Sequence, residues 1–143
     1  MLRKLLPALS LSLSLALAHG GPTLSIPSAG AVVRQMPGEV TVLFPEPLVL
    51  RRSAFRVYAL EASPALPPAR LRQAAADLAG RVLGKADTRA RADTGLRRGD
   101  WGPNAAVIGL KKGLKPGVYA VMWKAVTADG ASSSGSFYFI YRP

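Results

Sequence analysis

The chain has 143 residues, which suits a single domain, and its 49% hydrophobic and 19% charged content excludes wholesale disorder. The absence of cysteine excludes disulfides, zinc fingers, iron–sulfur clusters and thiol nucleophiles. A single histidine also excludes histidine-rich metal sites and two-histidine acid–base mechanisms. The formal net charge of +11 makes an anionic partner the first to consider, and the cellular compartment decides which one.

The N-terminus has the pattern of a cleaved secretory signal. Arg3 and Lys4 form a positive region, residues 5–17 are largely apolar, and Ala16-Leu17-Ala18 matches the small-x-small pattern that signal peptidase reads. The apolar stretch is shorter than the about 20 residues that a bilayer-spanning helix needs. We therefore expect a signal peptide over residues 1–18 and a domain over 19–143. The mature protein would be periplasmic or otherwise exported and would have no stable membrane span.

Cleavage after Ala18 would make His19, the only histidine, the first residue of the mature chain. A free α-amine and the imidazole Nδ1 of the same residue can chelate one metal ion. Such a nitrogen pair suits Cu(II), which prefers a square plane of nitrogen and oxygen donors. The alternative is an ordinary polar residue after a signal peptide, because one residue is not a metal site.

Short segments of apolar and polar alternation predict β-strands in the mature chain. The first is at 40–44, within a region of short strands and turns over 23–44, and the next is at 55–60. Three more follow at 105–110, 118–126 and 136–141, separated by Lys115-Pro116-Gly117 and by Asp129-Gly130 with a serine-rich run. This spacing predicts an all-β fold, an antiparallel β-sandwich of immunoglobulin-like type.

A segment at about 64–104 interrupts this rhythm and is predicted to be a short helical, basic insertion. Apolar residues recur at helical spacing from Leu71 to Val82, and Gly84 follows where a helix often ends. Residues 85–99 carry no apolar period and are predicted to be a loop. Eight basic side chains lie between positions 70 and 98: Arg70, Arg72, Arg81, Lys85, Arg89, Arg91, Arg97 and Arg98.

The basic insertion has two interpretations. It is either a solvated loop or a surface for anionic lipid, a polyanion or an acidic protein. Nucleic acid is not expected as a partner, because the protein is exported and no aromatic residue interrupts the basic run before Trp101. The chain has no phosphate-binding loop, paired-carboxylate motif or nucleophile elbow, so we expect a binding protein and not an enzyme.

The mature sequence resembles the copper resistance protein C (CopC) family of periplasmic copper-binding domains. The resemblance rests on the order and spacing of several pieces: His19, the segment 25–31, Pro37-Gly38-Glu39-Val40 leading to Phe44 and Pro47, the Tyr119-x-Val121-x-Trp123 strand, and Ala128-Asp129-Gly130. It implies an immunoglobulin-like (cupredoxin-like) β-sandwich in the periplasm. It also implies a Cu(II) site made by the N-terminal histidine, an aspartate, and a histidine two residues after that aspartate.

Transferred to this sequence, the resemblance makes His19 and Asp129 the metal ligands, whereas Ala131 stands where the second histidine is expected. The ligand set is thus reduced to two nitrogens and one oxygen. The mature methionines, Met36 and Met122, fit a loop and a strand and are not assigned as ligands.

Two functions remain open at this point. The first is a Cu(II) carrier or buffer in copper homeostasis or resistance, with a membrane copper transporter or another envelope protein as partner. The second is a metal-free interaction module of the cell envelope that uses its basic insertion. A copper oxygenase with an N-terminal histidine brace is disfavoured, because the brace needs a second histidine.

Overall fold

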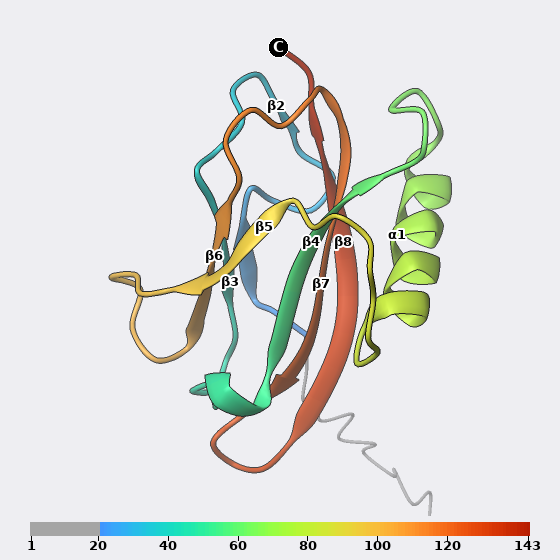
Figure 1. The fold of residues 1–143 in the computed structure, drawn as a ribbon. Helices are drawn as coiled ribbons and strands as arrows, with labels where there is room; N and C mark the ends of the chain where they lie inside the picture. The colour runs from blue at the N-terminus through green and yellow to red at the C-terminus, as the bar shows by residue number, and fades with distance from the viewer. Residues whose placement is uncertain (1–20) are drawn as a thin grey trace, which may run out of the picture.

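The protein is a sandwich of two four-stranded sheets in the computed structural model, which describes residues 21–143 (Figure 1). The predicted signal peptide and His19 lie outside the described residues. One sheet has the order β1 (Leu24–Ile26), β3 (Glu39–Leu43), β6 (Ala105–Leu110), β5 (Asp93–Arg97). The other has the order β2 (Val32–Val33), β8 (Ser132–Tyr141), β7 (Gly117–Val126), β4 (Ala54–Leu60). A 3₁₀ turn, η1 (Leu50–Arg52), precedes β4, and a helix, α1 (Pro68–Val82), follows it.

The predicted β-sandwich is confirmed, with one departure from a purely antiparallel arrangement. The five strands expected from alternation correspond to β3, β4, β6, β7 and β8, and they pair antiparallel with their neighbours. The two-residue strand β2 instead pairs parallel with the end of β8, from Val32 opposite Ile140 to Val33 opposite Tyr141. This strand is too short for its alternation to be recognised.

The main core lies between the two sheets and takes one face of each. It contains alternate residues of β3 and β4, such as Val40 and Val42 and Phe55 and Val57. Four aromatic residues of β7 and β8 are buried there: Tyr119, Trp123, Phe137 and Phe139. The rings of Tyr119 and Phe139 stack with centroids 5.6 Å apart. Their role is structural, as expected for large apolar side chains on facing strands.

Helix α1 covers the outer face of the sheet that contains β4, β7 and β8 (Figure 1). Leu71, Leu78 and Val82 of the helix form a second buried cluster with Met122 and Tyr138 of the sheet. This sheet is therefore buried on both faces, which explains why β7 is apolar along most of its length. The helix was correctly predicted, and Gly84 follows it with φ +74°.

The prediction of a loop over residues 85–99 is wrong for β5, which pairs with β6. The strand was missed because its sequence, Asp-Thr-Gly-Leu-Arg, shows no apolar alternation, and Gly95 stands at an irregularity in the pairing. Polar contacts hold it instead. The buried Asp93 carboxylate accepts hydrogen bonds from the backbone N–H of Val57 (2.7 Å) and from the Arg91 guanidinium (2.8 Å).

These contacts also cover the outer edge of β4. The N–H of Ala92 donates to the carbonyl of Val57 (2.8 Å), and Arg91 Nη2 donates to the carbonyl of Phe55 (3.3 Å). Backbone groups that would otherwise be open at this edge strand thus have partners. The basic segment is an integral part of the fold, because it provides the helix on one sheet and the last strand of the other.

Candidate metal site

Asp129 lies on the turn that joins β7 to β8 at one end of the sandwich. The turn closes through hydrogen bonds from Thr127 N to the carbonyl of Ala131 (3.0 Å) and from Gly130 N to the carbonyl of Thr127 (2.9 Å). Gly130 has φ +84°, a left-handed conformation that glycine adopts without strain. The Asp-Gly pair therefore forms the tight hairpin turn that the sequence indicated.

The carboxylate of Asp129 is oriented by its own turn. Its Oδ1 accepts hydrogen bonds from the Thr127 hydroxyl and from the N–H of Ala131, the latter at 3.1 Å. Such local bonds from an aspartate to the backbone two residues later are typical of turns. They hold the side chain at the exposed tip of the hairpin, beside position 131. Sequence reasoning placed the missing histidine at that position.

Backbone contacts with the segment after β3 attach this turn to the rest of the molecule. Ala128 N donates to the carbonyl of Pro47 (2.8 Å), and Leu48 forms an isolated antiparallel bridge with Thr127. The segment that contains Pro47 follows β3 and lies at the end of that strand. The described chain begins at the same end, because Thr23 N donates to the carbonyl of Leu43, the last residue of β3 (2.7 Å).

Gly21, the first described residue, is two residues after His19, a separation that the extended chain covers in about 7 Å. His19 itself lies outside the described residues, so its position relative to Asp129 stays a prediction. Within residues 21–143, no group of three or more histidine, cysteine, aspartate or glutamate side chains is placed to hold a metal ion. A site at this end would need the residues before Gly21.

The structure adds one acidic residue that sequence reasoning did not single out. Glu46 is exposed and directly precedes Pro47, whose carbonyl is bonded to the Asp129 turn. It belongs to the same group of loops, although more than 80 residues separate it from Asp129 in the sequence. Its only local signal was the Pro45-Glu46-Pro47 break between two strands.

The two methionines of the described chain are packed against the hydrophobic clusters of the fold. Met122 is fully buried beneath α1, and Met36 is half-buried against the main core. Their placement agrees with the interpretation of both as structural residues.

The basic side chains of the segment 64–104 differ in their surroundings. Arg91 is bound to Asp93, and Arg97 Nε donates to the Glu39 carboxylate at 2.9 Å. Arg70, Arg72 and Arg81 lie on exposed positions of α1. The segment is therefore not one uniform charged surface. None of the helices in the described part of the chain has the length and apolar character needed to cross a membrane.

The two-sheet sandwich is shared with a known class of small proteins. The model of the CopC domain family matches residues 23–142, and the chain belongs to this family. A comparison with curated protein sequences gave no match.

Solved structures with the same fold include PcoC, a methionine-rich copper resistance protein from Escherichia coli. It is 21% identical, with a TM-score of 0.60, over 87% of this chain and 100% of PcoC. The selenomethionine form of PcoC gives 20% identity and the same TM-score over 86% of this chain and 100% of its own. CopC from Methylosinus trichosporium OB3b is 17% identical, with a TM-score of 0.60, over 87% of this chain and 95% of CopC.

Proposed function

We propose that the protein is an exported copper-binding protein that carries or buffers Cu(II) in copper homeostasis or resistance. Membership of the CopC domain family supports the proposal, as does the fold shared with PcoC and CopC, the former described as a copper resistance protein. The observation that carries it is the Asp129 turn, which lies at the end of the sandwich where the described chain begins.

The proposed ligands are the α-amine and imidazole of His19 and one carboxylate oxygen of Asp129. An amine and an imidazole from one residue form a chelate, and Cu(II) favours nitrogen and oxygen donors in a plane. The Ala131 side chain has no donor atom, so water or the Glu46 carboxylate would complete the plane. With one ligand fewer than the family pattern, we expect weaker binding than in a complete site.

The signal pattern supports a periplasmic or otherwise exported location, where the mature chain would begin at His19. In this compartment the natural partners of a copper carrier are the copper ion itself and a membrane copper transporter or another envelope protein. The acidic turn and the beginning of the chain share one end of the molecule, so metal would be exchanged from that end.

The test is a Cu(II) titration with paramagnetic resonance, on protein that mass spectrometry shows to begin at His19. We expect one equivalent bound with a nitrogen and oxygen signature. His19→Ala should abolish binding, and Asp129→Asn should weaken it by about tenfold or more, because a carboxylate ligand is lost. Asp77→Asn, the same change on an exposed face of α1, is the matched control and should bind like the wild type.

Binding that is unchanged in both His19→Ala and Asp129→Asn would contradict the assignment of the site. No binding above that of the buffer would contradict the copper function itself. The sandwich would then be the metal-free interaction module that the sequence also allowed.

A further inference from the structure

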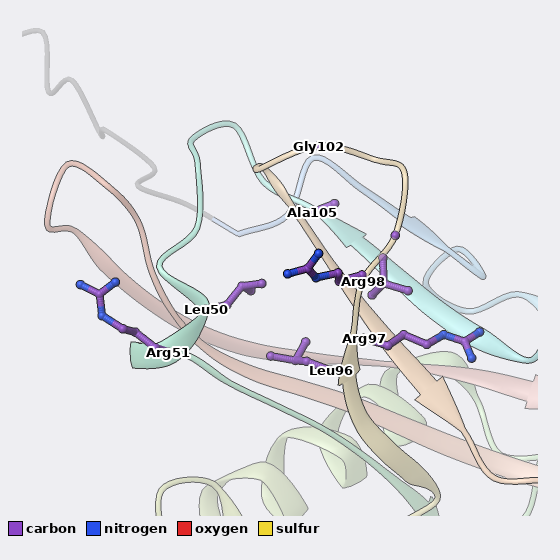
Figure 2. Close-up of a pocket in the computed structure, with 9 residues that line it drawn as sticks. Leu50, Arg51, Leu96, Arg97, Arg98, Gly102 and Ala105 are labelled. Carbon is purple, nitrogen blue, oxygen red and sulfur yellow. The ribbon is translucent and has the colours of Figure 1, made fainter.

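A groove lies between η1 and the end of the β5–β6 hairpin (Figure 2). It has a volume of about 550 Å³. Its lining residues are Leu50, Arg51, Leu96, Arg97, Arg98, Gly99, Gly102, Ala105 and Val107. We call it the η1–β5 groove. Its volume falls within the range of about 300–1,000 Å³ that is usual for ligand pockets, which is large enough for a bulky side chain.

The walls of the groove are apolar and open to solvent. Leu50 is 40% exposed and Leu96 is 38% exposed, although both are large aliphatic residues. Trp101, in the loop that closes the hairpin, is 48% exposed. Arginine residues beside an apolar concave surface are typical of protein–protein contacts, where arginine is one of the residue types that contribute most of the binding energy.

The loop wall is rigidly shaped by close packing. A Cβ atom on Gly99 would lie 2.5 Å from Cγ2 of Val107, so the loop backbone rests directly on β6. Gly102 has φ +82°, which a residue with a side chain rarely adopts. Close packing of the loop backbone on β6 therefore fixes the position of this wall of the groove.

The charge around the η1–β5 groove is positive. Arg51 and Arg52 are exposed on η1, and Arg98 is exposed on the opposite wall, whereas Asp100 is the acidic residue of the loop. Figure 2 shows the Arg98 side chain extending across the groove toward Leu50, while Arg97 points the other way. Because the Arg97 guanidinium is already bound to Glu39, the Arg98 guanidinium is the one of the two that is placed to contact a ligand in the groove.

The strand geometry favours an extended occupant. β5 is the last strand of its sheet, and its residue Leu96 forms one wall of the groove. An extended peptide can lie along such an edge, with main-chain bonds to the strand and side chains in adjacent pockets. A concave groove beside a strand edge fits a peptide better than the flat surface of a membrane.

We propose that the η1–β5 groove binds an extended acidic segment of a partner protein, which places a bulky apolar side chain between Leu50 and Leu96 and its carboxylates beside Arg98 and Arg51. Because Val49 N, next to η1, donates to the carbonyl of Val126 (2.8 Å), a partner bound here would lie near the Asp129 turn. The proposal depends on the groove alone, so it stands whether or not copper binds.

The test begins with selection of a random peptide library on the mature protein without copper. We expect the enriched peptides to combine a run of Asp and Glu with one Leu, Phe or Trp. A synthetic peptide of the enriched sequence should bind about tenfold or more weakly to Arg98→Glu, because an attractive charge becomes repulsive. Leu50→Ser should also weaken binding. Arg72→Glu, the same charge reversal on α1, is the control and should change affinity less than about twofold.

Thermal unfolding of each variant checks that a loss of binding does not come from loss of the fold. Failure to enrich any acidic peptide would overturn the proposal, as would peptides that bind Arg98→Glu and Leu50→Ser like the wild type. Vesicles of phosphatidylglycerol and phosphatidylcholine provide the remaining comparison. If no acidic peptide is enriched, but the protein binds these vesicles and Arg98→Glu abolishes that binding, the proposed peptide partner would be wrong. The groove would then bind a lipid surface.

Discussion

At the level of single residues, Asp93 shows how a charge can stabilise an edge of this fold. Its side chain is 1% exposed, and it accepts bonds from Val57 N, Arg91 and Gly95 N. Removing its charge leaves Arg91 without its anion and weakens the bond to Val57, which costs about 2 kcal/mol since Arg91 is partly open to water. Urea unfolding of Asp93→Asn should show this loss of stability.

The matched control for Asp93 is Asp77→Asn on the exposed face of α1, which should change the free energy of unfolding by less than about 0.5 kcal/mol. Equal stability of the two variants would mean that the edge of β4 is held by its backbone bonds alone.

Position 131 gives the sharpest test of the metal site. The N–H of Ala131 lies 3.1 Å from Asp129 Oδ1, so a side chain at 131 starts beside the carboxylate. We expect Ala131→His to raise Cu(II) affinity by about tenfold or more, because an imidazole would replace a water ligand. Competition with a chelator of known affinity measures the gain. Ala128→His, at an exposed position of the same turn, is the control for adding a histidine nearby.

An unchanged affinity in Ala131→His would mean that the turn and His19 do not share a metal ion. A gain of equal size at position 128 would mean that any histidine at this end attracts copper.

At the level of elements, prediction from sequence succeeded where burial is one-sided. Alternation identified β3, and helical spacing identified α1, because each places its largest apolar residues on one buried face. It failed for β5, which is held by polar contacts to a strand that precedes it by more than 30 residues. The same limit applies to the candidate metal site, because residues that come together only through tertiary contacts leave no local pattern in the sequence. Asp129 was predicted to be a ligand from a family resemblance, and its role stays a prediction. Glu46 was not singled out, because only tertiary contacts bring its loop to the turn.

Helix α1 is predicted to be required for stability, although the sequence marked it as part of an insertion. Leu71 is 1% exposed and lies in the cluster with Met122 and Tyr138. Leu71→Ala should lower the free energy of unfolding by about 3 kcal/mol, because it removes buried methyl groups and leaves a cavity. Chemical denaturation measures the change, and Gln73→Ala on the exposed side of the helix should have little effect. A loss below about 1 kcal/mol would mean that the helix docks loosely.

At the level of the whole molecule, the candidate metal site and η1, which borders the proposed groove, lie at one end of the sandwich. The Asp129 turn, η1 and the start of the described chain are joined there by backbone hydrogen bonds, while α1 covers the outer face of one sheet. The excess of basic over acidic side chains attracts anionic partners, and the η1–β5 groove is the proposed place where such a partner binds. A metal ion and a protein partner could thus be bound at neighbouring positions.

The state of the N-terminus decides whether this end can hold copper at all. A mature chain whose His19 α-amine is acetylated carries an amide there, which is a poor metal ligand at neutral pH. We expect its Cu(II) affinity to fall by about a hundredfold, by loss of the chelate ring. The free amine, with a pKa of about 8, must lose its proton to bind, so the affinity of the cleaved chain should rise from pH 6 to about pH 8. Titration of both chains across this range measures the effect, and equal affinities would assign copper to ligands other than the amine of His19.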